Sequence, residues 1–558
     1  MRKFTTLLLA GAAMFALVSC DKENGVEPTP SVSADNYGQV VFEESLRAIN
    51  EDQKETDNLT EEKAVNNAQL FTGTELTQIT KFTANGSFYM SDVFEFSGTT
   101  GTLESGLVVN GSALGLAAAD RVATKTISID DLGKLVTSGK FVMSSKSNES
   151  KTIKDKVAKE NVAPGNNLLD FEVERVVSKL QVSQPTAGIK VKDDAPIKGK
   201  VTGARYSLAG SANKVYLFKD KAVGNRRLTQ DGTTGLFIYD GFESAIHSDA
   251  LTTFTGTAFN VRRDLQKVSD LKLKTLLTTD TQFGTLNSLE VVADAAYDSA
   301  SNLNGIYFLE NSLPVKITAA GQVDYADIAH AKIYVTFEPD ASKVYKWNAG
   351  TSALVNIVAA DMADRIDEIE VTKADYDAAS YQVETTKPAD YAAMKTLGKK
   401  IVRFTDDNGT PADPADDKYY FILANTAKTF YRGADKILYL NLSDARKAGN
   451  AKTEKYVDGK MLFKTPANAQ KAAADAAFHG YLDTRRNNIY SLQVTSISNL
   501  GLNYDPADPN DPNTPDPKDE NPDEPEKDKK DPVDDNKNYL QVKATILPWN
   551  LVHREVEL

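Results

Sequence analysis

Residues 503–537 separate a part of the chain that can form hydrophobic cores from a short tail. This segment consists almost entirely of Asp, Asn, Pro, Glu and Lys, with eight prolines between positions 506 and 532. Such a composition buries too little apolar surface to fold, and the repeated prolines favour an extended backbone. We therefore predict an Asp/Pro-rich spacer over residues 503–537 and a separate tail over residues 538–558.

The tail has the alternation of apolar and polar residues that is typical of β-strands. Its alternating apolar positions are Leu540, Val542, Ala544 and Ile546 in a first stretch, and Val552, Val556 and Leu558 in a second. Pro548 lies between the two stretches and lacks the N–H that a central ladder needs. We expect two strand segments. In the second, the charged Arg554 lies among the alternating apolar positions, where burial of its side chain is unfavourable.

The first residues have the pattern of a bacterial lipoprotein signal. Arg2 and Lys3 precede an apolar run over residues 7–18, which is too short to span a bilayer as a helix. The run ends at Cys20, the single cysteine of the chain, in a sequence that fits a lipobox. We predict a signal peptide over residues 1–19 and lipidation of Cys20, palmitate included. A buried structural cysteine is the alternative, but it explains neither the basic start nor the apolar run.

The segment after Cys20 combines a tether with one strand. Residues 21–36 are rich in Pro, Ser, Glu and Asp without a hydrophobic period, which is typical of an unfolded linker. Residues 37–43 are β-branched and aromatic, which predicts a strand carrying Val40 and Phe42. We predict a lipidated propeptide over residues 20–47 that includes this strand.

The remaining body contains short strand patterns separated by turn signals, without long helices between them. This arrangement favours β-sandwiches over a doubly wound sheet. We predict an N-terminal sandwich over residues 48–195, ending with an alternating strand over residues 171–182, and a C-terminal sandwich over residues 196–502 with helical inserts at 389–397 and 467–478. The clearest predicted strands are residues 86–96, 140–145, 215–218, 235–239, 305–309, 332–337, 436–442 and 460–463.

We find no motif of an enzyme, a metal site or a cofactor site. The four histidines have no ligand spacing, and the sequence has no glycine-rich phosphate loop or nucleophile elbow. The acidic residues 406–417 suggest calcium, but Phe404 stands where an EF-hand loop needs its first carboxylate, so a solvated hairpin tip is favoured. The net charge of −14 disfavours nucleic acid as a partner. We expect a protein that is not an enzyme and needs no cofactor.

Several segments together resemble the fimbrillins, or type V pilins, of Bacteroidales. The resemblance is strongest in the last part of the chain, and it is weak over residues 100–140 and 240–400. The segments that carry it are residues 173–179, 456–460, 486–490 and 497–501, the spacer, and residues 546–549 and 555–558.

The resemblance implies two transthyretin-like β-sandwich domains and a precursor that is cut after an arginine. Arg47, followed by Ala48, is the matching position. Arg47 as an ordinary surface residue is the alternative. A cut at another arginine, such as Arg121, Arg175 or Arg205, would destroy the first domain.

Such a cut would release the strand with Val40 and Phe42 and leave a groove for the tail of a neighbouring copy, a form of β-strand addition. Both tail segments are candidate donors. We favour the terminal one, with Val552, Val556 and Leu558, because a free end enters a groove without loop closure.

The function predicted from these observations is that of a stalk subunit of a cell-surface fimbrium that supports adhesion and biofilm formation. Its expected partners are copies of itself, anchor and tip subunits, an Arg-specific protease, and the outer membrane, to which the lipid holds the precursor. Two alternatives stay open. One is an anchor or tip subunit, although a tip needs no donor tail and an anchor must keep its lipid. The other is a lipid-anchored glycan-binding or adhesive module.

Overall fold

A computed structural model of the chain describes residues 36–44, 64–211, 214–218, 228–230, 237–239, 289–293, 305–310, 328–468, 484–503 and 540–548, apart from short gaps at 86–87, 97–98, 121, 123–124, 138–139, 146–148, 412, 451–452 and 485. Within these ranges the protein is mainly β, as predicted. No helix in the described part combines the length and the apolar character that a membrane span requires.

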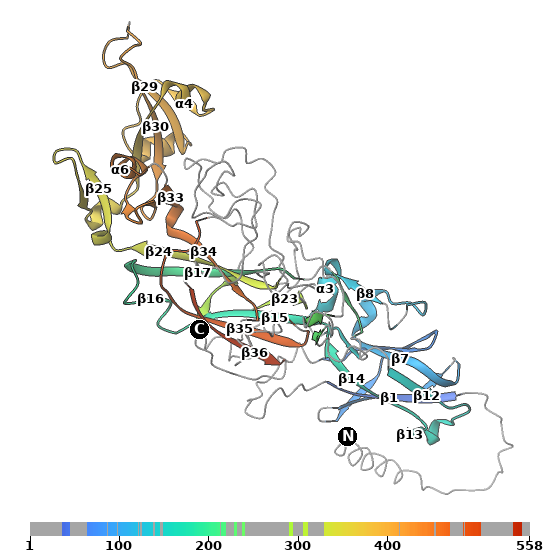
Figure 1. The fold of residues 1–558 in the computed structure, drawn as a ribbon. Coiled ribbons are helices and arrows are strands. Elements are labelled where there is room, and N and C mark those ends of the chain that lie inside the picture. Colours follow the sequence, from blue (N-terminus) through green and yellow to red (C-terminus); the bar gives the residue numbers. More distant parts are fainter. Residues whose placement is uncertain are drawn as a thin grey trace, which may run out of the picture.

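The N-terminal unit is one curled sheet that encloses its own core (Figure 1). Its main path runs β3-β2-β7-β11-β14-β1-β5-β4, with β12, β13 and β6 attached to β7, β14 and β1. Apolar residues from both ends of this path meet in one core: Ile79 of β3 belongs to the cluster, and Phe82 of β4 packs against it. The strands are β1 Asn36–Glu44, β2 Ala68–Thr72, β3 Glu75–Ile79, β4 Phe82–Asn85, β5 Phe88–Ser91, β6 Phe94–Phe96, β7 Gly101–Val109, β11 Met143–Ser145, β12 Glu149–Ile153, β13 Ala163–Pro164 and β14 Asn167–Arg175.

The C-terminal unit is a β-sandwich of two sheets. Leu180, Phe308 and Leu492 of one sheet share a core with Leu208, Ile333 and Phe463 of the other. The first sheet contains β15 Val177–Gln184, β16 Lys190–Val191, β22 Val292–Ala293, β23 Ile306–Leu309, β35 Asn488–Ile497 and β36 Leu540–Pro548. The second contains β17 Gly199–Ala209, β21 Leu289–Glu290, β24 His330–Pro339 and β34 Lys460–Pro466.

The alternating segment expected to end the first domain is two strands that belong to different sheets. β14 pairs with β1 and β11 in the N-terminal sheet, whereas β15 pairs with β23 and β35 in the C-terminal sandwich. The chain changes sheets at Val176, which is buried and whose N–H donates to the carbonyl of Val142. The prediction that residues 171–182 form one strand of the first domain was therefore wrong for β15, which belongs to the C-terminal sandwich. β14 and β15 have the same apolar alternation, and only their long-range pairing shows that they lie in different sheets.

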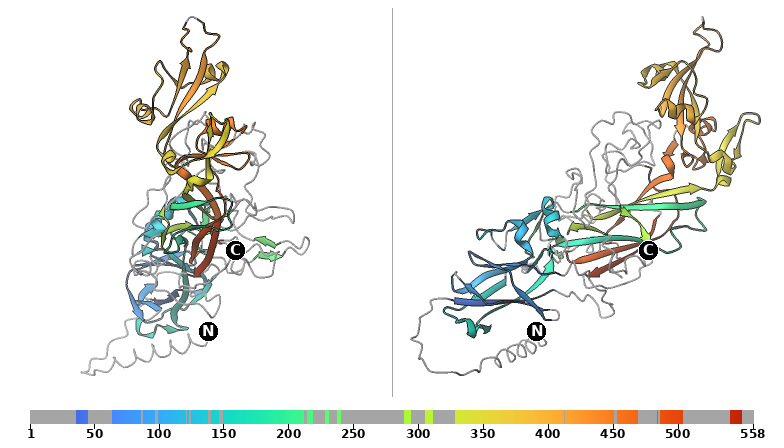
Figure 2. Two further views of the ribbon diagram at one scale, coloured as in Figure 1. Left: turned by 90° about the vertical axis from the view of Figure 1, so that its left-hand side faces the viewer. Right: turned by 180° about the vertical axis from the view of Figure 1, so that it is seen from behind.

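A second core joins the two units at this point. It contains Phe71 and Val108 of the N-terminal sheet together with Tyr307, Leu309 and Ile489 of the C-terminal sandwich. Short elements complete it: β8 Thr126–Ser128 pairs with β18 Lys214–Tyr216, β9 Val136–Thr137 pairs with β10 Lys140–Phe141, and α3 is Leu132–Leu135. Figure 2 shows the two units from two further sides.

A buried ion pair also lies at this junction. Arg486 Nη2 is 2.7 Å from Glu310 Oε1, and both side chains are almost fully buried. Arg486 also donates to the carbonyl oxygens of Leu217, at 2.8 Å, and Tyr216, at 2.6 Å. The guanidinium thus links the strand that begins at Asn488 with β18, which pairs with the N-terminal unit.

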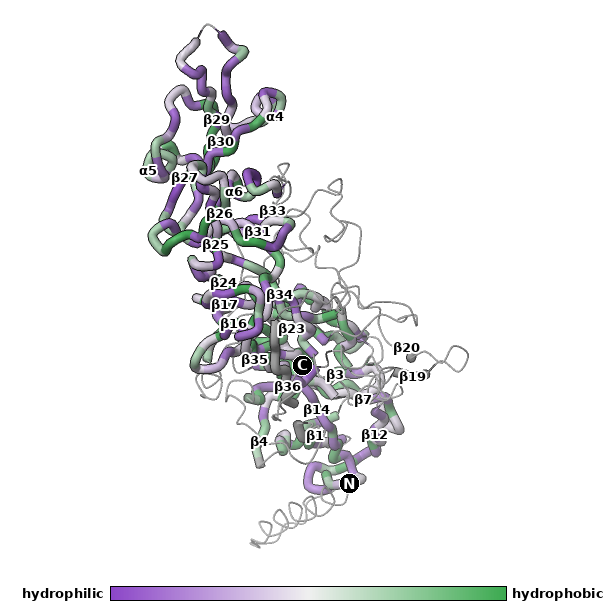
Figure 3. Tube along the Cα trace, turned by 60° about the vertical axis from the view of Figure 1, so that its left-hand side comes forward, coloured by the Kyte–Doolittle hydropathy of each residue, from purple (hydrophilic) through white to green (hydrophobic). Residues whose placement is uncertain are grey.

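An inserted module over residues 340–459 projects from the sandwich (Figure 1). The sequence pattern did not distinguish this module from the rest of the predicted C-terminal domain. Its strands are β25 Val344–Asn348, β26 Ala353–Asn356, β27 Arg365–Val371, β28 Gln382–Glu384, β29 Ile401–Asp406, β30 Lys418–Asn425, β31 Phe430–Gly433, β32 Leu438–Tyr439 and β33 Thr453–Tyr456, and its helices are α4 Lys373–Ala378, α5 Tyr391–Thr396 and α6 Leu442–Lys447. The acidic residues 406–417 connect β29 to β30 at its outer end, which is mostly hydrophilic in Figure 3.

A polar network fixes the interior of this module. The fully buried Asp367 accepts hydrogen bonds from the Leu442 N–H, at 2.7 Å, and from the N–H and hydroxyl of Ser443. Burial raises the pKa of Asp367, although these hydrogen bonds oppose the shift.

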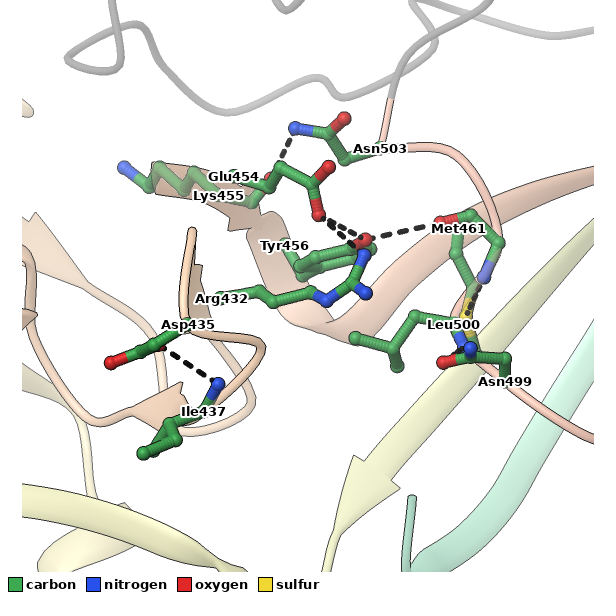
Figure 4. Close-up of polar contacts among 11 residues, drawn as sticks. Arg432, Asp435, Ile437, Glu454, Lys455, Tyr456, Met461, Asn499, Leu500 and Asn503 are labelled. Carbon is green, nitrogen blue, oxygen red and sulfur yellow. Dashed lines mark hydrogen bonds and ion pairs between the residues drawn. The ribbon is translucent and has the colours of Figure 1, made fainter. Parts of the chain in front are cut away.

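At the base of the module, the Tyr456 hydroxyl lies 3.1 Å from both Glu454 Oε2 and the Gly501 carbonyl oxygen (Figure 4). Burial and the neighbouring Glu454 carboxylate raise the pKa of Tyr456 well above its usual value.

Candidate functional site

The candidate site is the position of β1 inside the N-terminal sheet. β1 lies between two neighbours, parallel to β14 on one side and antiparallel to β5 and β6 on the other. Because β1 connects these strands, it is a central strand of the sheet although it comes from the predicted propeptide. Its removal would leave two unpaired strand edges.

Two alternate side chains of β1 fill the core of the unit. Val40 and Phe42 are 0% and 1% exposed. The Phe42 ring stacks on Tyr89 at 5.3 Å between centroids and meets the edge of Phe82 at 5.7 Å. Both residues were predicted from sequence as members of this strand, and both side chains lie in the core of the unit.

Polar residues hold the first end of β1. Asn36 Oδ1 accepts from the Val157 N–H at 3.0 Å and from Asn167 Nδ2 at 3.1 Å, while Asn36 Nδ2 donates to the Lys154 carbonyl oxygen. The Ser91 hydroxyl accepts from the Val40 N–H at 3.0 Å. Buried side-chain partners of this kind fix the register of a strand as well as its stability.

Gly38 occupies a tight position in β1. A Cβ atom built on Gly38 would lie 2.0 Å from Cε2 of Phe96, far inside contact distance. The Phe96 ring is buried, and it packs edge-on against Phe94 at 5.1 Å. The ring therefore lies where any larger residue of β1 would place its side chain.

The other sequence-predicted site residues lie outside the described residues. They are Cys20, the pair Arg47 and Ala48, and the tail residues Val552, Val556 and Leu558. The first tail segment is described as β36, and it pairs antiparallel with β35 from Asn488↔Pro548 to Ile497↔Leu540. Of the competing arginines, Arg175 is fully buried, so a protease cannot reach it in the folded chain.

Sequence reasoning missed the residues that lock β1 in place. Asn36 was predicted to belong to the tether, and neither Ser91 nor Asn167 was predicted to contact β1. One local signal is an asparagine directly before a β-branched and aromatic run, although this is also common in turns. Gly38 within the run was a second signal, since glycine in a strand often marks the close approach of another group.

Comparison with known families identifies the last part of the chain. Residues 454–555 match the family model described as major fimbrial subunit protein type IV, fimbrillin, C-terminal. This stretch begins in β33 and includes β34, β35 and β36.

Solved structures give weaker similarities. A putative cell adhesion protein from Parabacteroides distasonis has 12% identity, covers 92% of this chain and 99% of its own, and has a TM-score of 0.39. A fimbrilin from Porphyromonas gingivalis has 13% identity, covers 94% and 100%, and has a TM-score of 0.35. These scores are too low to bear on the fold. The match over residues 454–555 agrees with the resemblance to fimbrillins, and it covers the part of the chain in which that resemblance is strongest.

Proposed function

We propose that this chain is a structural stalk subunit of a cell-surface fimbrium that polymerises by donor-strand exchange. In this proposal it is exported as a lipoprotein through Cys20 and held on the outer membrane. An Arg-specific protease cuts between Arg47 and Ala48, and the subunits then join one another and the anchor and tip subunits. The fibre supports adhesion and biofilm formation, and the chain is not an enzyme.

The observation that carries the proposal is the central place of β1 in the sheet. A cut at Arg47 would separate β1 from residues 48–558, so the subunit would lose the strand between β14 and β5. Val40, Val41 and Phe42 are all buried, and at about 1.5–3 kcal/mol for each side chain their burial amounts to roughly 5–9 kcal/mol before ordering costs. The open groove therefore favours any strand that restores this burial.

The tail of a second copy supplies that strand. The spacer over residues 503–537 gives the tail reach, since an extended proline-rich chain spans about 3.1 Å per residue. The choice between the two alternating segments of the tail depends on the side chains that line the groove.

Arg47→Ala tests this function. The uncut precursor keeps β1 in its sheet, so we expect a folded monomer that forms no fibres in electron microscopy and no ladder on a mildly heated gel. Arg205→Ala is the matched control, because this arginine has a half-exposed side chain and an exposed ion pair with Glu290. We expect normal fibres from the control. Long fibres from Arg47→Ala, with β1 still attached, would refute strand exchange.

A further inference from the structure

The groove that β1 occupies has a graded size along its inward-facing positions. Gly38 lies against the Phe96 ring, Val40 follows in the core, and Phe42 fills the large site against Tyr89. The inward positions therefore accept a small, a medium and a large side chain in that order. A strand that replaces β1 has to reproduce this order, because overpacking a formed core is destabilising.

The tight position can adjust by a limited amount once β1 has left. Phe96 belongs to β6, whose ladder partner among the described strands is β1. Without β1, β6 has no described ladder that fixes it, so a small shift of the ring makes room for a methyl group. A branched or longer side chain needs a displacement that would also break the packing of Phe96 on Phe94.

The two tail segments differ at this register. The second segment, residues 552–558, contains no Gly, Ala or Ser. The first segment contains one small residue among its alternating apolar positions, Ala544, and Val542 and Leu540 precede it. Read toward the N-terminus, these three positions are small, medium and large.

We propose that the strand entering the groove is the first tail segment of a second copy, with Ala544 in the place of Gly38. This inference rests on the proposed strand exchange. Val542 then takes the place of Val40 and Leu540 that of Phe42, so the incoming strand runs opposite to β1. The same polarity as β1 would put Pro548 at the Phe42 position, where its missing N–H would interrupt a central ladder. The assignment replaces the expectation that residues 552–558 insert.

Three consequences follow from this register. Gln541 takes the place of the buried Val41, so its amide needs a hydrogen-bond partner there, and the apolar burial restored comes from Val542 and Leu540. Ile546 takes the place of Asn36, so the Val157 N–H loses its side-chain acceptor, whereas Asn167 keeps the Lys154 carbonyl oxygen at 3.0 Å as an acceptor. The segment must also leave β35, with which it pairs in the single chain. Exchange thus replaces the ladder with β35 by one with β14 on one side and with β5 and β6 on the other.

Size variants at position 544 test the assignment in matured protein, residues 48–558. We expect Ala544→Leu to assemble at least about tenfold more slowly, because its side chain collides with Phe96. Ala544→Gly should assemble at the normal rate, and Phe96→Ala should restore assembly of Ala544→Leu. Val556→Leu is the matched control and should have no effect. Normal assembly of Ala544→Leu, or a loss of fibres on deleting residues 552–558 alone, would return the donor role to the second segment.

Cross-linking tests polarity and register directly. Glu95 is exposed and lies opposite Tyr37 in the β1 ladder. In the proposed register Thr545 of a second copy takes the place of Tyr37, so Thr545→Cys in one copy should form a disulfide with Glu95→Cys in another. A disulfide from Lys543→Cys instead would show the same polarity as β1 and overturn the register. Mass spectrometry of the fibres distinguishes failure of strand exchange from failure of this assignment. Fibres that retain residues 36–44 contradict strand exchange itself. Fibres that lack these residues but assemble normally with Ala544→Leu contradict only the assignment of the donor segment.

Discussion

Phe42→Ala should affect the precursor but not the fibre, because Phe42 belongs to the strand that the proposed maturation removes. Phe42 is 1% exposed and contacts the rings of Tyr89 and Phe82. Truncation of a buried Phe to Ala costs about 3–5 kcal/mol, so we expect the N-terminal unit of the precursor to lose that free energy of unfolding. Urea denaturation of the Arg47→Ala precursor, with and without the second change, measures this loss.

The matured fibre should not show the loss. If β1 has left, fibres grown from the Phe42→Ala precursor have the same composition as wild-type fibres and should dissociate at the same denaturant concentration. Phe141→Ala is the control, because Phe141 is fully buried, packs on Tyr307 at 5.2 Å and stays in the mature chain. It should weaken both precursor and fibre. Fibres of Phe42→Ala that are as unstable as their precursor would show that β1 remains in place and would refute the reasoning.

Three further predictions address the signal, the junction and the module. Cys20→Ala should leave an unlipidated precursor with its signal uncleaved, because this thiol is the only acyl acceptor in the chain, and normal palmitate labelling would contradict it. Arg486→Met should lower the free energy of unfolding by about 3–5 kcal/mol, since it leaves the Glu310 carboxylate buried without its cation; denaturation measures this, and a loss below about 1 kcal/mol would show that the pair is dispensable. Burial raises the folded-state pKa of Asp367 above that of the unfolded chain, so the folded state binds more protons and stability falls as pH rises through this window. Asp367→Asn should reduce this fall, measured by urea denaturation as the pH is raised from about 4, and an unchanged slope would argue against the buried carboxylate as its source.

The sequence predicted the β character and the strand that forms the candidate site, because both depend on local patterns. β-branched and aromatic residues around Val40 and Phe42 indicate a strand wherever it pairs. What the sequence did not predict is long-range. That β15 pairs with β35, more than three hundred residues later in the chain, is invisible to periodicity. The inserted module also escaped notice, since its strands have the same composition and spacing as those of the sandwich around it.

Within the site, the sequence did not predict the polar contacts of β1 or the steric constraint at Gly38. Asn36 forms three hydrogen bonds at one end of β1, but an asparagine beside a linker is ordinary in sequence. The tightness at Gly38 depends on a ring from β6, nearly sixty residues away in the sequence. Such contacts exist only after the sheet has assembled, so a one-dimensional pattern carries little information about them.

The inserted module leaves and re-enters the sandwich on neighbouring strands. β24 pairs with β34, and Thr336 lies opposite Lys460, so the insertion begins and ends at the same end of two adjacent strands. The base of the module shares the sandwich core through Phe430 and Tyr456, whereas the outer strands pack in a separate cluster with Ile369 and Phe421. The outer part can therefore change in size, sequence or charge without moving the strands of the sandwich. Variation of this outer surface is thereby uncoupled from the sheet of β1, on which the proposed assembly depends. In the proposed fibre, copies that carry different outer surfaces would therefore stay interchangeable.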